Sequence, residues 1–313
     1  MKKLYLVIPC YNEEEVINET AKQLVSKLKC LMDKDKIDQE SKIVFVDDGS
    51  KDRTWEMICE LNNDNECIRG IKLSRNKGHQ NALLAGLLTV KEEADMVISL
   101  DADLQDDINA IDEMVDKYHE GCDIVYGVRS QRDKDSLFKK YTAQGFYKFI
   151  KMLGVEIVYN HADYRLMSSR ALDALEEHKE VNLFLRGIIP LIGFKTDVVT
   201  YERSERFAGE SKYPLKKMLA FALEGITSFS IKPIRIITAI GSLIFTISLV
   251  FLCYFLVSHF RGYTVKGWTS TIVSVWALGG FQLLAIGMIG EYIGKMYLET
   301  KARPKFFVDK YLK

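Results

Sequence analysis

The stretch Met96-Val97-Ile98-Ser99-Leu100-Asp101-Ala102-Asp103-Leu104-Gln105-Asp106 decides the fold class. Its first five residues are a short, largely apolar run typical of a buried strand, and acidic residues follow at once. In an open α/β sheet, ligands bind beyond the carboxyl ends of the strands. The acids that follow this strand are therefore candidates for ligand contacts, with a solvated acidic loop as the alternative.

The same pattern recurs through residues 1–130. Further apolar runs of strand length lie at Leu4–Ile8, Ile43–Val46, Ile68–Leu73 and Ile124–Tyr126. Helical patterns lie between the runs, at Glu13–Leu31, Thr54–Asn62, Gln80–Lys91 and Asn109–His119. This alternation predicts an α/β domain with a Rossmann-like parallel sheet that helices cover on both faces.

Composition limits the classes of function. Lys+Arg and Asp+Glu both number 43, so the net charge is zero and does not indicate a nucleic-acid-binding protein. The six cysteines are scattered without a Cys-x-x-Cys pair, which favours a reduced cytosolic environment. The apolar run at Leu4–Ile8 is too short for a signal peptide, and Pro9 ends it.

Two long apolar segments, Ile236–Val257 and Trp268–Gly290, predict a transmembrane hairpin, because each is long enough to cross a bilayer as a helix. Basic residues concentrate outside the pair, which predicts that both ends are cytoplasmic. These residues are Lys216, Lys217, Lys232 and Arg235 before the pair, and Lys295, Lys301, Arg303 and Lys305 after it.

The predicted domains are a cytoplasmic α/β domain at 1–213, an interfacial helix at 214–233, the hairpin at 234–290 and a cytoplasmic tail at 291–313. The helix before the hairpin has an apolar face, so packing on the α/β domain is an equal alternative to a place in the membrane interface. In the second span, Gly280, Gly287, Gly290 and Gly294 lie on one face, as close contacts between membrane helices require, either with the first span or with another subunit.

The acidic string at residues 101–106 suits a metal ion. Asp101 and Asp103 leave the strand two residues apart, and with the carbonyl of Gln105 they form an all-oxygen set suited to Mg²⁺ or Mn²⁺. A bound diphosphate would complete the shell. The pair Asp47 and Asp48, which follows another strand, strengthens this interpretation.

Other strand ends carry further candidates, each with a structural alternative. Asn12 suits a helix N-cap. Asp47 and Asp48 suit ribose hydroxyls and a base edge, or a simple Asp-Gly turn. Arg129 follows the fifth strand and suits a phosphate, a pair with one of the acids, or an ordinary surface position.

Several strings together resemble the inverting GT-A glycosyltransferases of the bactoprenol glucosyltransferase and dolichyl-phosphate mannosyltransferase kind. They are VIPCYNEEE (7–15), VDDGSKDRT (46–54), SRNKGHQNALLAG (74–86), DADLQDD (101–107), YRLMSSR (164–170) and RFAGESKY (206–213). The hairpin and the closing GEYIGKMYLETKARPKF (290–306) resemble the bactoprenol glucosyltransferase branch. One departure is Ile108, where the family commonly has a proline.

The resemblance implies a nucleotide-sugar donor and a polyisoprenyl phosphate acceptor at a membrane. UDP-glucose is the leading donor, and UDP-N-acetylglucosamine or another nucleotide sugar remains open. A homo-oligomer, possibly a tetramer, is also implied.

The resemblance further assigns roles to single residues. Donor contacts fall on Pro9, Tyr11, Glu13, Val46, Asp47, Asp48, Asp101, Ala102 and Arg129. It implies that Asp101, Asp103 and Gln105 are the metal ligands. It also implies that Arg165, Arg206 and Lys212 bind phosphate or the acceptor.

The resemblance also implies that Asp103 and Asp163 are the catalytic residues. A phosphate acceptor with a second pKa near ~6 is largely ionised at neutral pH and barely needs a base. Asp163 is therefore either a general base or a positioning residue, and the sequence leaves this open.

Two other function classes fit less well. A processive polysaccharide synthase would carry a Gln-x-x-Arg-Trp string, which is absent here. A non-enzymatic scaffold or lipid transporter fits poorly, because the predicted spans contain no charge that would mark a transport path.

Overall fold

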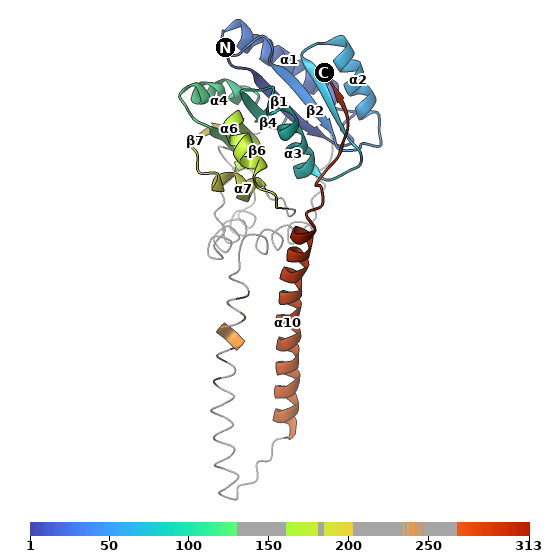
Figure 1. Cartoon of the computed structure of the whole chain (residues 1–313), viewed down its shortest axis with the longest axis vertical. Coiled ribbons are helices and arrows are strands. Elements are labelled where there is room, and N and C mark those ends of the chain that lie inside the picture. The colour runs from blue at the N-terminus through green and yellow to red at the C-terminus, as the bar shows by residue number, and fades with distance from the viewer. Residues whose placement is uncertain are drawn as a thin grey trace, which may run out of the picture. The chain divides into compact units, whose positions relative to one another are not determined.

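A computed structural model describes residues 1–129, 161–180, 185–202 and 268–313, with isolated positions between 234 and 246 (Figure 1). The chain divides into two compact units. Unit 1 comprises residues 1–147, 156–213 and 302–313, and unit 2 comprises residues 148–155 and 214–301. Unit 1 is thus built from separate parts of the chain.

Unit 1 contains a sheet with the strand order β7-β5-β6-β4-β1-β2-β3-β8. The strands are β1 (Leu4–Cys10), β2 (Lys42–Asp47), β3 (Ile68–Leu73), β4 (Met96–Ser99), β5 (Ile124–Arg129), β6 (His161–Ser168), β7 (Thr196–Tyr201) and β8 (Val308–Leu312). The helices are α1 (Ile17–Asp33), α2 (Thr54–Asp64), α3 (His79–Val90), α4 (Ala110–His119), α6 (Ser169–Glu176) and α7 (Leu185–Leu191). The α/β prediction is confirmed, as are the five predicted strands.

The predicted parallel sheet is confirmed for β1, β2, β3 and β4, but the complete sheet is mixed. β6 runs antiparallel to its neighbours β4 and β5, and β8 runs antiparallel to β3. The sequence pattern concealed both strands because each carries charged residues, such as Asp163 and Arg165 in β6. The result is a mixed sheet in which β6 enters at the edge where β4 and β5 end.

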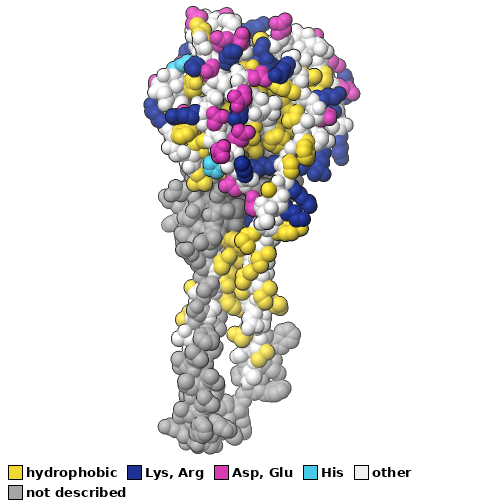
Figure 2. Space-filling model, in the orientation of Figure 1, with side chains coloured by type: hydrophobic (Ala, Val, Ile, Leu, Met, Phe, Trp, Pro, Cys, Tyr) yellow, Lys and Arg dark blue, Asp and Glu magenta, His cyan; other side chains and the backbone are white. Residues whose placement is uncertain are grey.

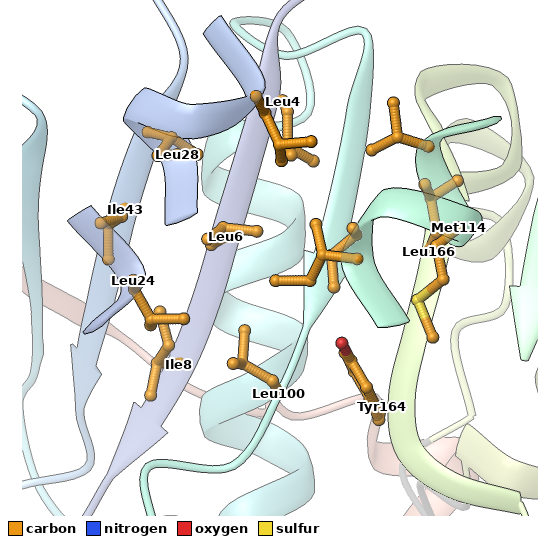
Figure 3. Packing of buried hydrophobic residues seen from close by; sticks show 14 of the residues in the cluster. Leu4, Leu6, Ile8, Leu24, Leu28, Ile43, Leu100, Met114, Tyr164 and Leu166 are labelled. Atoms are coloured by element: carbon orange, nitrogen blue, oxygen red, sulfur yellow. The ribbon is translucent and has the colours of Figure 1, made fainter. Parts of the chain in front are cut away.

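The core of unit 1 follows from the alternation of side chains along β1. Leu4, Leu6 and Ile8 are buried on the face that α1 covers, where they meet Leu24 and Leu28 (Figure 3). α3 packs on β1 and β2. Since helices cover the broad surfaces of the sheet, its polar contacts with ligands are left to the strand ends.

β8 fixes the C-terminus of the chain to unit 1. It pairs with β3, and Tyr311 lies against Arg69 and Glu93, which form an ion pair. The Tyr311 hydroxyl accepts from Arg69 Nη1 (3.0 Å) and lies 3.3 Å from Glu93 Oε1. Burial, countered by the Arg69 charge, raises the pKa of Tyr311 to about 12. The predicted tail at 291–313 therefore contains a strand that the sequence analysis did not identify.

Unit 2 is described mainly through α10 (Trp268–Lys301), which covers the second predicted span. In the part of the chain that the structure describes, no helix combines the length and the apolar character that a membrane span requires. Exposed hydrophobic side chains lie along α10, among them Leu283, Ile286 and Ile293 (Figure 2). The first predicted span and the interfacial helix lie largely outside the described residues. The hairpin therefore stays a prediction.

Gly49 closes the turn after β2 in a backbone conformation that favours glycine, with φ at 68°. A Cβ atom there would lie 2.7 Å from the backbone nitrogen of Asn76. We expect Gly49→Ala to lower the free energy of unfolding by about 2–4 kcal/mol, because left-handed strain and overpacking add. Urea unfolding measures this change.

Gly121→Ala is the matched control, because Gly121 also has a positive φ (89°) but its added Cβ would meet no atom closer than 3.9 Å. It should cost only the backbone strain, about 1–2 kcal/mol. Equal costs for the two variants would show that the approach of Asn76 to Gly49 contributes nothing.

Candidate active site

The site lies at the edge of the sheet where β1, β2 and β4 end. β1 is the switch point of the topology, since the chain continues to β2 on one side and later returns to β4 on the other. β6 begins at this same edge, because it runs antiparallel to β4 with Ser99 opposite Arg165. Asp163 therefore lies beside the acids that follow β4, although sixty residues separate them in the sequence.

Asp47 and Asp48 have different surroundings. Both are buried, and Asp47 Oδ1 accepts a hydrogen bond from the backbone of Ser50 (3.1 Å). Asp47 Oδ2 is buried without a hydrogen-bond partner among the described residues. A buried oxygen of this kind costs free energy until a donor meets it, which suits a ligand contact.

Asp48 instead holds the loop between β3 and α3. Its two oxygens accept from the backbone nitrogens of Lys77 (2.7 Å) and Gly78 (2.8 Å). Burial raises the pKa of Asp48, and these two hydrogen bonds counter the rise. Gly78 has a φ of 85° and directly precedes His79, the first residue of α3. Asp48 thus fixes the position from which His79 enters the site.

The loop after β1 differs from its prediction in one respect. Asn12 is not a helix N-cap, because α1 begins only at Ile17 and Asn12 has a positive φ (56°). Its backbone nitrogen donates to Ser50 Oγ, and its Oδ1 accepts from the backbone of Lys51. The residue therefore joins the loops after β1 and β2.

The predicted donor residues around these loops have unequal access to a ligand. Tyr11 is exposed, whereas Pro9, Val46 and Ala102 are buried. The Glu13 backbone nitrogen donates to Thr54 Oγ1.

Backbone contacts shape the acidic loop after β4. The Ala102 carbonyl accepts from Thr20 Oγ1 (2.7 Å), and Asp103 Oδ1 accepts from the Gln105 backbone nitrogen (3.2 Å). Leu104 between them has a φ of 54°. The loop therefore turns sharply, and Gln105 is buried beneath it.

Asp101 and Asp103 supply some of the oxygen ligands that a divalent cation needs. No group of three or more His, Cys, Asp or Glu side chains is arranged to hold a metal within the described ranges. However, burial raises the pKa of Asp101 to about 6; nearby His79 counters this rise, and Asp106, Asp163 and Asp103 add to it. A cation would relieve this concentration of negative charge. Asp101 and Asp103 fit Mg²⁺ or Mn²⁺ if the substrate supplies further oxygens.

Arg129 pairs with an acid, which was one of its predicted alternatives. Its Nη2 lies 3.5 Å from Asp106 Oδ1, and the Tyr201 hydroxyl donates to the same oxygen (2.6 Å). Asp106 is buried, while the Arg129 side chain remains partly exposed. Tyr201 from β7 therefore belongs to the site, which the sequence analysis did not predict.

Four residues form what we call the Asp163 cluster: His79, Asp163, Arg165 and Arg186. Asp163 Oδ1 accepts from Arg165 Nη2 and from Arg186 Nε (3.2 Å), and its Oδ2 accepts from Arg186 Nη2 (3.0 Å). His79 Nε2 lies 3.7 Å from Asp163 Oδ2 and 3.5 Å from Asp101 Oδ1. The imidazole thus stands between the acidic loop and Asp163.

Electrostatics keep Asp163 ionised. Burial alone would raise its pKa, but the adjacent His79 and the charges of Arg186 and Arg165 lower it well below its ordinary value. Burial would lower the pKa of His79, and the two carboxylates beside it outweigh that effect and raise it. Asp163 is consequently a weak proton acceptor.

Two members of this cluster were not predicted. His79 lies within the string SRNKGHQNALLAG, and its position after a strand was the signal that could have identified it. Arg186 lies in the apolar segment of α7, where no local pattern marks it. Arg165, predicted to bind phosphate, is buried and contacts Asp163. Arg206 and Lys212 lie outside the described residues.

Comparisons with known proteins identify the family of this chain. Residues 5–176 match the family model "Glycosyl transferase family 2". "Uncharacterized glycosyltransferase YkoT" of Bacillus subtilis (strain 168) is 54% identical over 98% of this chain and 91% of that protein. "Bactoprenol glucosyl transferase" of Shigella phage SfX is 40% identical over 98% of both chains.

A solved structure is similar at a lower level. It is glucosyl-3-phosphoglycerate synthase from Mycobacterium tuberculosis in complex with Mn²⁺, UDP and glucosyl-3-phosphoglycerate. Its identity is 15% over 72% of this chain and 78% of that chain, with a TM-score of 0.43. The family match and the relatives that span nearly the whole chain show that this protein is a glycosyltransferase of family 2.

Proposed function

We propose that the protein transfers a single glucose from UDP-glucose, with inversion, to undecaprenyl phosphate or another polyisoprenyl phosphate at the cytoplasmic face of a membrane. The observation that carries this proposal is the similarity to proteins named bactoprenol glucosyl transferase, about 40% identical along nearly the full length of both chains. These names describe the relatives, and the geometry of the site supports extending them to this chain.

The Asp163 cluster supports a phosphate acceptor. A hydroxyl acceptor requires a general base, but Asp163 is held by two guanidinium groups that lower its pKa and weaken it as a base. A phosphate monoester is already ionised near neutral pH, with a second pKa of about 6. Asp163 therefore positions its neighbours in this proposal and does not abstract a proton.

The other candidate residues are assigned to different parts of the two substrates. Asp47, with its buried unpartnered oxygen, and the exposed Tyr11 suit the nucleoside. Asp101 and Asp103 would hold a divalent cation, which would supply positive charge beside the leaving diphosphate. Arg206 and Lys212 are proposed to bind the lipid phosphate.

The test is a transfer assay with the purified full-length protein in detergent. We expect undecaprenyl phosphate and UDP-glucose to give a lipid product heavier by one hexose, whereas undecaprenol should give none. A panel of nucleotide sugars, including UDP-N-acetylglucosamine, identifies the donor by product mass. Transfer to the free alcohol, or no lipid product with any donor, would refute the proposed acceptor.

We further propose that residues 234–290 form a membrane hairpin with both ends cytoplasmic, and that the glycine-bearing second span supports a homo-oligomer. Single cysteines at Ser258 and Thr264, in a chain without its six native cysteines, should react with an impermeant maleimide in intact cells. A cysteine at Ser136 should react only after permeabilisation. Equal reactivity of all three positions in intact cells would contradict the hairpin.

A further inference from the structure

Arg186 is fixed in direction by the contacts that it makes. Its Nε and Nη2 bind the two oxygens of Asp163 at 3.2 and 3.0 Å. A guanidinium that makes two parallel hydrogen bonds to one carboxylate has its plane and orientation set. Arg186 is therefore preorganised before any substrate binds.

The helix that carries Arg186 is also fixed. The backbone nitrogen of Leu185, its first residue, donates to Gln80 Oε1 of α3 (2.9 Å). The side chains of Leu185, Ile188 and Ile189 are buried. Because Gln80 directly follows His79, this contact secures the start of α7 beside the residue that stands between Asp101 and Asp163.

The two guanidinium groups that bind Asp163 differ in their exposure. The Arg165 side chain is 1% exposed, whereas that of Arg186 is 38% exposed. Of the two guanidinium groups, that of Arg186 is therefore the one that a ligand can reach from solvent.

The strand order indicates where Arg186 and Asp163 lie relative to a bound donor. Along the edge, the acids proposed for the nucleoside follow β2 and the acids proposed for the diphosphate follow β4. Asp163 lies on β6, which pairs with β4 on the side away from β1. A donor laid along the edge from β2 to β4 thus leaves the Asp163 cluster beyond its diphosphate. An acceptor that attacks with inversion approaches from the side opposite the leaving group.

We propose that Arg186 binds the phosphate group of the acceptor and that Asp163 is its positioning residue. The proposal rests on the proposed function for the nature of the acceptor. A guanidinium matches phosphate because its donors form a planar fork that can bind two oxygens, a geometry that lysine lacks. Asp163 contributes by fixing the fork while it neutralises the buried Arg165.

The test measures KM for both substrates of the full-length protein, with undecaprenyl phosphate and UDP-glucose. Arg186→Gln should raise the KM for the lipid phosphate by roughly tenfold to a hundredfold, the effect of one charge-assisted hydrogen bond. The KM for UDP-glucose should stay within about twofold. Arg186→Lys should give an intermediate KM for the lipid, because it keeps the charge and loses the fork.

Two further variants separate positioning from general structural damage. Asp163→Asn should also raise the KM for the lipid phosphate, and adding Arg186→Gln to it should raise that KM no further. Arg170→Gln is the matched control, since Arg170 makes the same two-bond contact with Asp123 on an exposed part of α6. It should leave both KM values unchanged.

An unchanged KM for the lipid phosphate in Arg186→Gln would overturn the inference, and so would a rise confined to UDP-glucose, which would assign Arg186 to the donor diphosphate. Binding of undecaprenyl phosphate without donor distinguishes this inference from the proposed function. If wild type binds this lipid through Arg186 but transfers no sugar to it, the proposed function fails and the inference stands. If wild type does not bind the lipid, both fail.

Discussion

Asp103→Asn is expected to lower turnover by on the order of 10²–10³-fold while the protein stays folded. The loss follows from removing one of the two carboxylates, Asp101 and Asp103, that are proposed to hold the cation. The fold should survive because Asp103 Oδ1 accepts a hydrogen bond from the Gln105 backbone, and the amide oxygen of asparagine can accept it too. Turnover with and without EDTA, and after addition of Mg²⁺ or Mn²⁺, measures the effect.

A direct binding measurement accompanies this assay. The affinity for Mn²⁺ in the presence of UDP should fall in Asp103→Asn, which electron paramagnetic resonance can follow without catalysis. Asp64→Asn, at the exposed end of α2, removes the same charge far from the acidic loop and should change neither quantity. Wild-type turnover by Asp103→Asn in EDTA would show that the reaction does not depend on a cation at this loop.

Asp163→Ala is expected to lower the free energy of unfolding by about 3–5 kcal/mol and to abolish most activity. Its removal leaves the buried guanidinium of Arg165 without the carboxylate that neutralises it. Arg186 loses the same partner, so its direction is no longer fixed. Urea unfolding of the full-length protein, followed by circular dichroism, measures the stability.

The double variant Asp163→Leu, Arg165→Met tests the cause of this loss. If an uncompensated buried charge is responsible, the double variant should regain most of the stability, because apolar residues replace both partners, and it should remain inactive. Asp173→Ala removes a carboxylate that pairs with Lys91 near the surface and should cost at most about 1 kcal/mol. Similar costs for Asp163→Ala and Asp173→Ala would show that burial of the pair is unimportant.

The fold was predictable where the sequence pattern is local. Apolar periodicity, which depends only on neighbouring residues, predicts strands such as Leu4–Cys10 and helices such as Thr54–Asp64. β6 and β8 were missed because their positions in the sheet are set by distant partners. β6 keeps Arg165 in a central strand because Asp163 pairs with it, and no local pattern reveals that compensation.

In the candidate site, too, the features set by local sequence were predictable and those set by distant partners were not. The acids at 101–103 and 47–48 were identified because they follow strands, and strand ends converge on one edge. What each acid does there was not predictable, since Asp48 has both oxygens on the backbone of a neighbouring loop. Arg186 could not be predicted as a site residue, because only the packing of α7 beside α3 brings it to Asp163.

The pairing of β8 with β3 has a consequence for how the protein is made. Positions 74–307 separate the two strands, and a ribosome that adds roughly 5–20 residues per second needs on the order of 10–50 s to translate them. Throughout that interval the nascent chain carries β3 with one side unpaired, and such an edge is a template for wrong pairing. Unit 1 therefore gains its last strand only after positions 74–307, which include all residues of unit 2, have been translated.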